Sequence, residues 1–166
     1  KHPDYVIPLF NLTTTYLHLG DYNKALELGL QCLELKEKIY GKEHSSYANS
    51  LSNVALTYSK LGDYSQSLEL NFQCLELKEK IYGKEHPHYA NTLGNLGSDY
   101  SYLGNYNKAL ELNLQCLNLI EKRYGKVHPD YTKYLSNLSM NYLDLGNYLR
   151  SLELDLQCLE LKEKIY

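Results

Sequence analysis

The residues best suited to chemistry in this sequence are cysteines and histidines that recur at one fixed interval of 42 residues. The cysteines are Cys32, Cys74, Cys116 and Cys158, and the histidines with the same step are His2, His44, His86 and His128. Thiols and imidazoles bind zinc, and thiols also form disulfides or act as nucleophiles. A tetrahedral zinc site needs its ligands to converge on one ion, and a disulfide needs two Cα atoms within about 7 Å.

The fixed step argues against such convergence. Equivalent residues of stacked helical repeats lie one or two helix diameters apart, and a helix is about 10 Å wide. We therefore expect the thiols to be small buried packing groups, and the histidines to cap or wedge the loops between repeats. The sequence predicts no metal and no cofactor. Free thiols are typical of a reducing compartment, which predicts a cytoplasmic location.

The remaining sequence adds no catalytic pattern. We find no glycine-rich phosphate loop, no catalytic-triad spacing and no paired acids, so we predict that the protein is not an enzyme. The net charge is −3, whereas proteins that bind nucleic acid usually carry a basic surface. No apolar run approaches the roughly 18 residues of a membrane span. We expect neither nucleic acid nor membrane as a partner. The chain opens inside a repeat, without a signal peptide, which suggests a piece of a longer parent.

The same period organises the whole sequence. Glycines recur with it at Gly20, Gly62, Gly104 and Gly146, and tyrosines at Tyr16, Tyr58, Tyr100 and Tyr142. In the second repeat, helical apolar spacing predicts one helix from about Ser45 to Lys60 and another from about Tyr64 to Ile81. Gly62 supplies the left-handed turn between them, and Gly83 ends the second helix. Pro8 falls inside the first helix of the first repeat, so that helix is expected to begin near Pro8 or to kink there.

The third repeat resembles the tetratricopeptide consensus. It reads Asn95-Leu96-Gly97, then Tyr100, Leu103-Gly104, Tyr106, Ala109 and Cys116, with the cysteine where a small alanine is usual. The 42-residue period and the linker from Gly83 to Pro87 resemble those of kinesin light chain. The resemblance implies an all-α fold, a right-handed α-solenoid of four helix-turn-helix repeats. It also implies one array over 1–166, with repeats at approximately 1–42, 43–84, 85–126 and 127–166.

In proteins that this chain resembles, the first helix of each repeat lines a concave groove that receives peptides. The repeats provide a separate indication, because the second helices barely vary while the first helices vary in selected columns. Those columns are Phe10/Ser52/Gly94/Ser136, Thr14/Leu56/Ser98/Met140, Leu17/Ser59/Ser101/Leu143 and His18/Lys60/Tyr102/Asp144. The first three share one helix face, and the fourth lies beside its end. The candidate peptide-binding residues are Asn53, Ser52, Leu56, Ser59, Asn95, Ser98, Tyr102, Lys133, Asn137 and Met140.

One column of the predicted groove is constant, with Asn11, Asn53, Asn95 and Asn137. A ladder of amides could hold an extended peptide backbone, or it could bond neighbouring repeats and fix the stack. Both interpretations stay open. A clamp for acidic chaperone tails, known in some tetratricopeptide domains, is not expected. Its five positions fall on Ser52, Leu56, Asn95, Lys133 and Asn137, and only Asn95 and Lys133 match.

The sequence therefore predicts a protein-interaction scaffold that binds a partner peptide or helix in the concave groove. The alternative from another class is a structural array that stacks end to end into oligomers or superhelices. That alternative has a physical motive, because no polar capping helix follows Tyr166 and the last repeat leaves an apolar face bare. The near-identity of the second helices also fits recent duplication, or a designed consensus repeat protein with no ligand.

Overall fold

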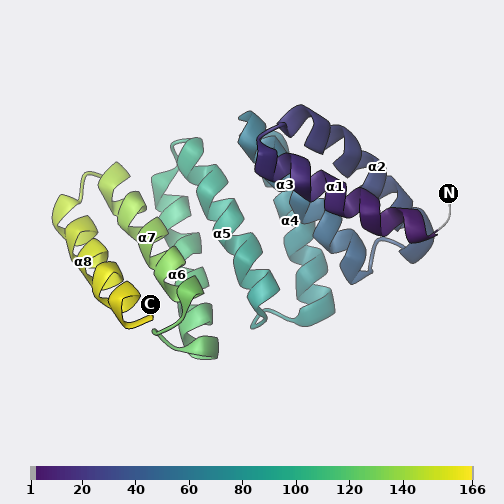
Figure 1. Cartoon of the computed structure of the whole chain (residues 1–166). Coiled ribbons are helices and arrows are strands. Elements are labelled where there is room, and N and C mark those ends of the chain that lie inside the picture. The colour runs from purple at the N-terminus through teal and green to yellow at the C-terminus, as the bar shows by residue number, and fades with distance from the viewer. Residues whose placement is uncertain (1–2, 166) are drawn as a thin grey trace. The chain divides into compact units, whose positions relative to one another are not determined.

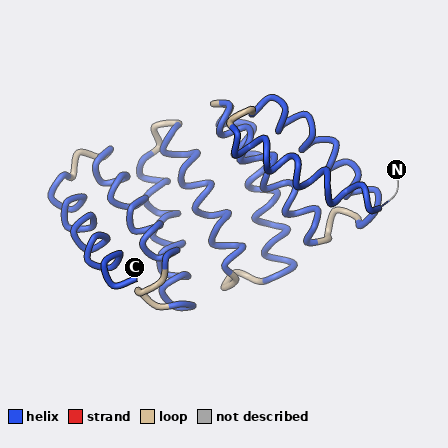
Figure 2. Tube along the Cα trace, viewed as in Figure 1, coloured by secondary structure: helices blue, strands red, loops and turns tan. Residues whose placement is uncertain are grey.

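The computed structural model describes residues 3–165, which form helices joined by short turns and contain no strand (Figures 1 and 2). A short 3-10 helix, η1, spans Pro3–Tyr5. The α-helices are α1 Val6–Leu19, α2 Tyr22–Tyr40, α3 Ser45–Leu61, α4 Tyr64–Tyr82, α5 Pro87–Tyr102, α6 Tyr106–Tyr124, α7 Pro129–Asp144 and α8 Tyr148–Ile165. They form four helix pairs, one for each 42-residue repeat. The predicted all-α class built from helix-turn-helix repeats is confirmed.

The chain divides into two compact units at the end of α4, between Ile81 and Tyr82. The first unit holds α1 to α4, and the second holds α5 to α8. Each unit therefore contains two helix pairs. The single array over 1–166 stays a prediction.

The turn inside each repeat follows the glycine and polar residue that mark it in the sequence. Gly62 ends α3 with φ 84°, the left-handed conformation that its position predicts. The N–H of Asp63 bonds to the carbonyl of Tyr58 at 3.0 Å, and the Asp63 carboxylate accepts from the N–H of Gln66 at 3.1 Å. The same two residues thus close one helix and open the next, which fixes the antiparallel pair.

The linker histidines cap the first helices, as expected. In repeat two, Nδ1 of His44 accepts a bond from the N–H of Ser46 at 3.1 Å, and the ring stacks on Tyr40 with centroids 4.8 Å apart. His86 and His128 repeat both contacts at α5 and α7. Among residues 3–165, no three or more His, Cys, Asp or Glu side chains are grouped closely enough to hold a metal ion. His2 lies outside the described residues.

Removing one of these caps should destabilise the fold measurably. We expect His44→Ala to lower the free energy of unfolding by about 1 kcal/mol, because an N–H at the start of α3 loses its acceptor. His44→Asn keeps a short side-chain acceptor at the N-cap and should lose less. Urea titrations followed by far-UV circular dichroism compare the two variants. Equal losses for alanine and asparagine would show that the ring stacking on Tyr40, and not the cap, stabilises the linker.

The four cysteines are free and buried, as their predicted packing role requires. Each thiol faces a backbone carbonyl of the first helix in its own repeat, as Cys116 Sγ does at 3.0 Å from Ala90 O. Equivalent contacts join Cys74 to Ala48 and Cys158 to Thr132. Burial raises the pKa of the Cys116 thiol to about 12. The thiols therefore bind the two helices of a repeat together.

The first helix accommodates Pro8 by starting close to it. α1 begins at Val6, so Pro8 is its third residue, and η1 precedes the helix as a separate turn. The first N–H groups of a helix have no intrahelical partner, so a proline there removes no bond. The expectation that this helix begins near Pro8 is confirmed.

Packing continues from one repeat to the next within each unit. Leu33 of α2 packs against Tyr47 and Leu51 of α3, so the second helix of repeat one covers the first helix of repeat two. In the second unit, Ile120 of α6 and Leu138 of α7 are fully buried. None of the helices described here is long and apolar enough to cross a bilayer.

Candidate binding site between α5, α6 and α7

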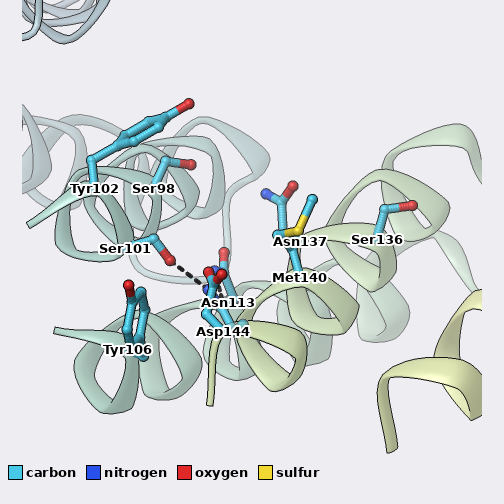
Figure 3. A pocket seen from close by; sticks show the side chains of 10 residues that line it. Ser98, Ser101, Tyr102, Tyr106, Asn113, Ser136, Asn137, Met140 and Asp144 are labelled. Atoms are coloured by element: carbon cyan, nitrogen blue, oxygen red, sulfur yellow. Dashed lines mark hydrogen bonds between the residues drawn. The ribbon is translucent and has the colours of Figure 1, made fainter. Parts of the chain in front are cut away.

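A cavity of about 630 Å³ lies in the second unit. It is lined by Ser98, Ser101 and Tyr102 of α5, Tyr106 and Asn113 of α6, and Ser136, Asn137, Met140, Asn141 and Asp144 of α7. The α5 side chains lie on one side and Ser136, Asn137 and Met140 on the other (Figure 3). Ligand pockets commonly have volumes of about 300–1,000 Å³, so this cavity can hold a side chain with part of its backbone.

Its floor is a chain of buried polar groups. Asn113 Nδ2 donates to Asn141 Oδ1 at 2.7 Å, and Asn141 Nδ2 donates to Ser101 Oγ at 2.6 Å (Figure 3). Asn113 Oδ1 is buried and has no hydrogen-bond partner among the described residues. A hydroxyl that accepts one bond still has a proton to donate and a second lone pair. The network therefore holds Ser101 in place and leaves its hydroxyl available to a ligand.

Gly97 allows this floor to form. A Cβ atom there would lie 3.0 Å from each of the amide atoms Cγ, Nδ2 and Oδ1 of Asn113. The buried amide thus packs directly against the backbone of α5. A side chain at this position would push the amide away from α5.

The rim combines apolar surface with one negative charge. Tyr102 and Met140 are large and exposed, so a ligand that covers them buries apolar area. Of the ten lining residues, Asp144 is the only charged one. The other polar groups are hydroxyls and amides, which can both donate and accept hydrogen bonds.

The structure brings four of the predicted groove residues into this cavity, namely Ser98, Tyr102, Asn137 and Met140. Asn95 and Lys133 belong to the same unit but do not line it. Lys133 Nζ lies 5.1 Å from the centre of the Tyr134 ring. The other four predicted residues, Ser52, Asn53, Leu56 and Ser59, lie on α3 of the first unit.

Sequence reasoning did not select six of the lining residues. They are Ser101, Tyr106, Asn113, Ser136, Asn141 and Asp144. Ser101, Ser136 and Asp144 stand in variable columns, which is a signal that could have found them. Asn113 lies on a second helix, in a column that reads Gly29, Asn71, Asn113, Asp155. That variation within the nearly constant second helices was the missed signal.

The asparagine ladder differs between the units. In the first unit, Asn53 Nδ2 donates to Thr14 Oγ1 on α1 at 3.2 Å, which joins two neighbouring first helices. In the second unit, the side chains of Asn95 and Asn137 make no hydrogen bond to another described residue, and Asn137 faces the cavity. Asn53 therefore has a structural contact, while Asn137 is available to a ligand.

This difference gives a paired prediction. Asn53→Ala should lower the free energy of unfolding by about 1 kcal/mol, because the Thr14 hydroxyl loses its donor. Asn137→Ala should leave stability within about 0.5 kcal/mol of the parent, since surface changes away from such contacts are nearly neutral. Chemical denaturation of both variants is the measurement. If Asn137→Ala lowered the free energy of unfolding as much as Asn53→Ala, both asparagines would serve only to hold neighbouring repeats together.

Two members of one variable column, Phe10 and Ser52, pack inside their own repeats. Ser52 contacts Cys74 Sγ at 3.1 Å and accepts a bond from Lys78 Nζ at 2.7 Å, both on α4. In repeat one, Lys36 Nζ lies 3.9 Å from the centre of the Phe10 ring. These side chains face the second helix of their own repeat. Both side chains therefore have a contact inside their own repeat, with a lysine opposite in each case.

Comparison with known proteins agrees with this architecture. The chain matches the tetratricopeptide repeat family over residues 5–80, 73–122 and 102–164. No curated protein sequence matches it. Among solved structures, a kinesin light chain-like protein from Podosopora anserina with nearly identical TPR-like repeats is 25% identical, with a TM-score of 0.84, over 100% of this chain and 79% of that one.

Two further structures share the fold at lower identity. BtubC from P. vanneervenii is 18% identical with a TM-score of 0.87, over 99% of this chain and 66% of that one. The apo form of RapI is also 18% identical, with a TM-score of 0.84, over 99% of this chain and 58% of that one. The resemblance to kinesin light chain-type repeats is confirmed. With helix pairs of this period and a family match along most of its length, the chain belongs to the tetratricopeptide repeat family.

Proposed function

We propose that this chain is a protein-interaction module whose second unit receives an extended segment of a partner protein in the cavity between α5, α6 and α7. Tetratricopeptide repeats generally mediate contacts between proteins, and solenoids offer extended concave surfaces for them. The observation that carries the proposal is the cavity itself. It is open between two first helices and carries exposed apolar side chains above a buried polar floor.

The partner side chain that fits this cavity best is arginine. Its guanidinium carries five donors and a fixed positive charge, and it stacks well on aromatic rings. Asp144 supplies the opposite charge, Tyr102 and Tyr106 supply rings, and the serine hydroxyls supply acceptors. A glutamate would meet like charge at Asp144 and find no lysine or arginine in the lining. The cavity thus favours a basic segment over an acidic one.

The partner's backbone would be held beside this side chain. The Asn137 amide faces the cavity and can donate to a peptide carbonyl and accept from a peptide N–H. Met140 would cover the apolar part of the bound side chain. The predicted contacts at Ser52, Asn53, Leu56 and Ser59 belong to the first unit and remain part of the proposal for a longer segment.

A catalytic role has less support. The lining residues include no histidine or lysine, and the Asp144 carboxylate forms no hydrogen bond with a serine of the cavity. A hydroxyl without a base is a poor nucleophile. We therefore propose binding, and not chemistry, as the use of this site.

The test uses three blocked peptides of sequence Ser-Ala-Xaa-Ala-Ser, in which Xaa is arginine, glutamine or glutamate. Fluorescence anisotropy of labelled peptides, titrated with the full chain, gives their relative affinities. We expect arginine to bind more tightly than glutamine, and glutamine more tightly than glutamate, with about tenfold between the extremes. Equal binding of all three, or a preference for glutamate, would exclude a cavity that selects a basic residue.

A further inference from the structure

Two serine hydroxyls of α5 line the cavity with opposite hydrogen-bonding roles. Ser98 and Ser101 lie about one helical turn apart (Figure 3). Ser98 Oγ donates its proton to the carbonyl of Gly94 at 3.1 Å, so its oxygen remains to accept a bond from a ligand. Ser101 Oγ accepts a bond from Asn141 Nδ2 at 2.6 Å, so its proton remains to be donated.

The role of Ser101 follows from the orientation of a buried amide. Asn141 Oδ1 accepts from Asn113 Nδ2 at 2.7 Å, so the nitrogen of the Asn141 amide is the end that faces Ser101. An amide nitrogen donates and does not accept, so Ser101 must accept at this contact. The two asparagines thus determine that Ser101 offers a proton to the cavity.

Helix packing alone does not require this pair of amides. The equivalent positions in the first unit hold Gly29 on α2 and Thr57 on α3, both buried. A Cβ atom at Gly29 would lie 3.3 Å from the side chain of Thr13, which stands where Gly97 stands in α5. The amide pair instead leaves Asn113 Oδ1 buried without a partner, which costs stability. A costlier arrangement beside the cavity indicates a use in binding.

One acceptor and one donor at this spacing match the backbone of an extended peptide. In a β-ladder, one residue turns its N–H and its carbonyl to the same side and bonds through both. Side chains three residues apart on a helix have Cβ atoms about 5–6 Å apart, which lets two hydroxyls reach both groups. The N–H precedes the carbonyl along a chain, as Ser98 precedes Ser101. A segment bound in this way runs in the same direction as α5.

The pair of hydroxyls is particular to the third repeat. The equivalent pairs are Thr14 with Leu17, Leu56 with Ser59, and Met140 with Leu143. Each of these lacks a hydroxyl at one position or at both. The backbone contact is therefore confined to the cavity of the second unit.

We propose that Ser98 accepts the N–H and Ser101 donates to the carbonyl of one residue of the partner segment, which then lies parallel to α5. Asn113 and Asn141 are positioning residues that fix Ser101 as the donor. This inference rests on the proposed function, because it takes the segment to lie in the cavity. It adds the extended conformation and the direction of that segment, and neither depends on which side chain is bound.

The test changes the backbone of the arginine peptide one residue at a time. N-methylation removes one N–H, and a thioamide replaces one carbonyl with a weaker acceptor. Anisotropy gives the affinity of each peptide for the parent chain, Ser98→Ala and Ser101→Ala. At one residue, N-methylation should weaken binding to the parent by about threefold to tenfold and leave Ser98→Ala unaffected. A thioamide at that same residue should weaken binding to the parent and leave Ser101→Ala unaffected.

The reverse pattern, in which N-methylation couples to Ser101 and the thioamide to Ser98, would overturn the assigned roles and direction. If neither serine variant changes the affinity while Asp144→Lys still reverses the preference between peptides, this inference fails and the proposed function stands. An arginine peptide that does not bind the parent at all would overturn both. Ser65→Ala, at an exposed position of α4, is the control and should bind as the parent does.

A transplanted set of residues tests the positioning role. Gly97→Thr, Asn113→Gly and Asn141→Thr together give the second unit the residues that the first unit carries at these places. The urea midpoint should not fall, because the unpaired acceptor is removed. The affinity for the arginine peptide should fall as far as in Ser101→Ala, and adding Ser101→Ala should cause no further loss. Full affinity in the transplanted variant would show that the two asparagines only pack and do not orient Ser101.

Discussion

Replacing Gly94 with alanine is expected to destabilise the second unit by about 1–3 kcal/mol, because the new methyl group has no room. Gly94 is buried in α5, and a Cβ atom there would lie 2.6 Å from Cε1 of Tyr134 on α7. The Tyr134 ring is fully buried, and its hydroxyl donates a hydrogen bond to Asn91. The ring therefore cannot swing aside without losing packing and that bond together.

A second substitution should relieve the clash. Tyr134→Thr introduces the residue that the preceding repeat carries at the same place, Thr92, and removes the ring that meets Gly94. Alone it should cost a few kcal/mol, since truncating a buried aromatic leaves a cavity. In the double variant the alanine methyl occupies part of that space. The double variant should therefore lose less free energy of unfolding than the sum of the losses in the two single variants. Urea denaturation of the four proteins gives the coupling, and strict additivity would show that Gly94 and Tyr134 do not determine each other.

Reversing the charge at Asp144 is expected to have the largest effect on binding. Asp144→Lys should weaken the arginine peptide by about tenfold or more, because a favourable charge contact becomes a repulsive one. The glutamate peptide should gain affinity from the same change. A reversal of preference between the two peptides is a stronger result than a loss, because a damaged cavity would weaken both.

Glu163→Lys is the control for this experiment. It makes the same change in net charge at an exposed position on α8, which does not line the cavity. Charges in solvent are screened beyond about 10 Å at 0.1 M salt, so this variant should bind both peptides as the parent does. If Glu163→Lys shifted the preference as much as Asp144→Lys, the selectivity would come from the overall charge of the protein.

The helices could be predicted closely because local residues determine where they end. The sequence placed a helix from about Ser45 to Lys60, and α3 spans Ser45–Leu61. The next was expected from about Tyr64 to Ile81, and α4 spans Tyr64–Tyr82. A left-handed glycine and a side-chain cap act within one turn, so they can be recognised without knowing the tertiary structure.

The candidate binding site could be predicted only in part, because variation between repeats has more than one physical cause. Gly94 stands where the other repeats carry Phe10, Ser52 and Ser136, because the Tyr134 ring of the next repeat leaves little room for a side chain. Tyr102 and Met140 vary in the same manner but face the cavity. The amino-acid types at one repeat position do not show whether they vary because of packing or because they face the cavity. The distinction depends on which side chain lies opposite, and that follows only from the packed helices.

Met140 is the only methionine in the sequence, so a ¹³C-labelled methyl group there gives a single NMR signal from inside the cavity. Titration with the arginine peptide should move this signal progressively to saturation, with an apparent affinity equal to that from anisotropy. The glutamate peptide at the same concentrations should leave it nearly in place. If the arginine peptide binds by anisotropy while the Met140 methyl signal does not move, the partner segment binds elsewhere, and the cavity between α5, α6 and α7 is not the binding site.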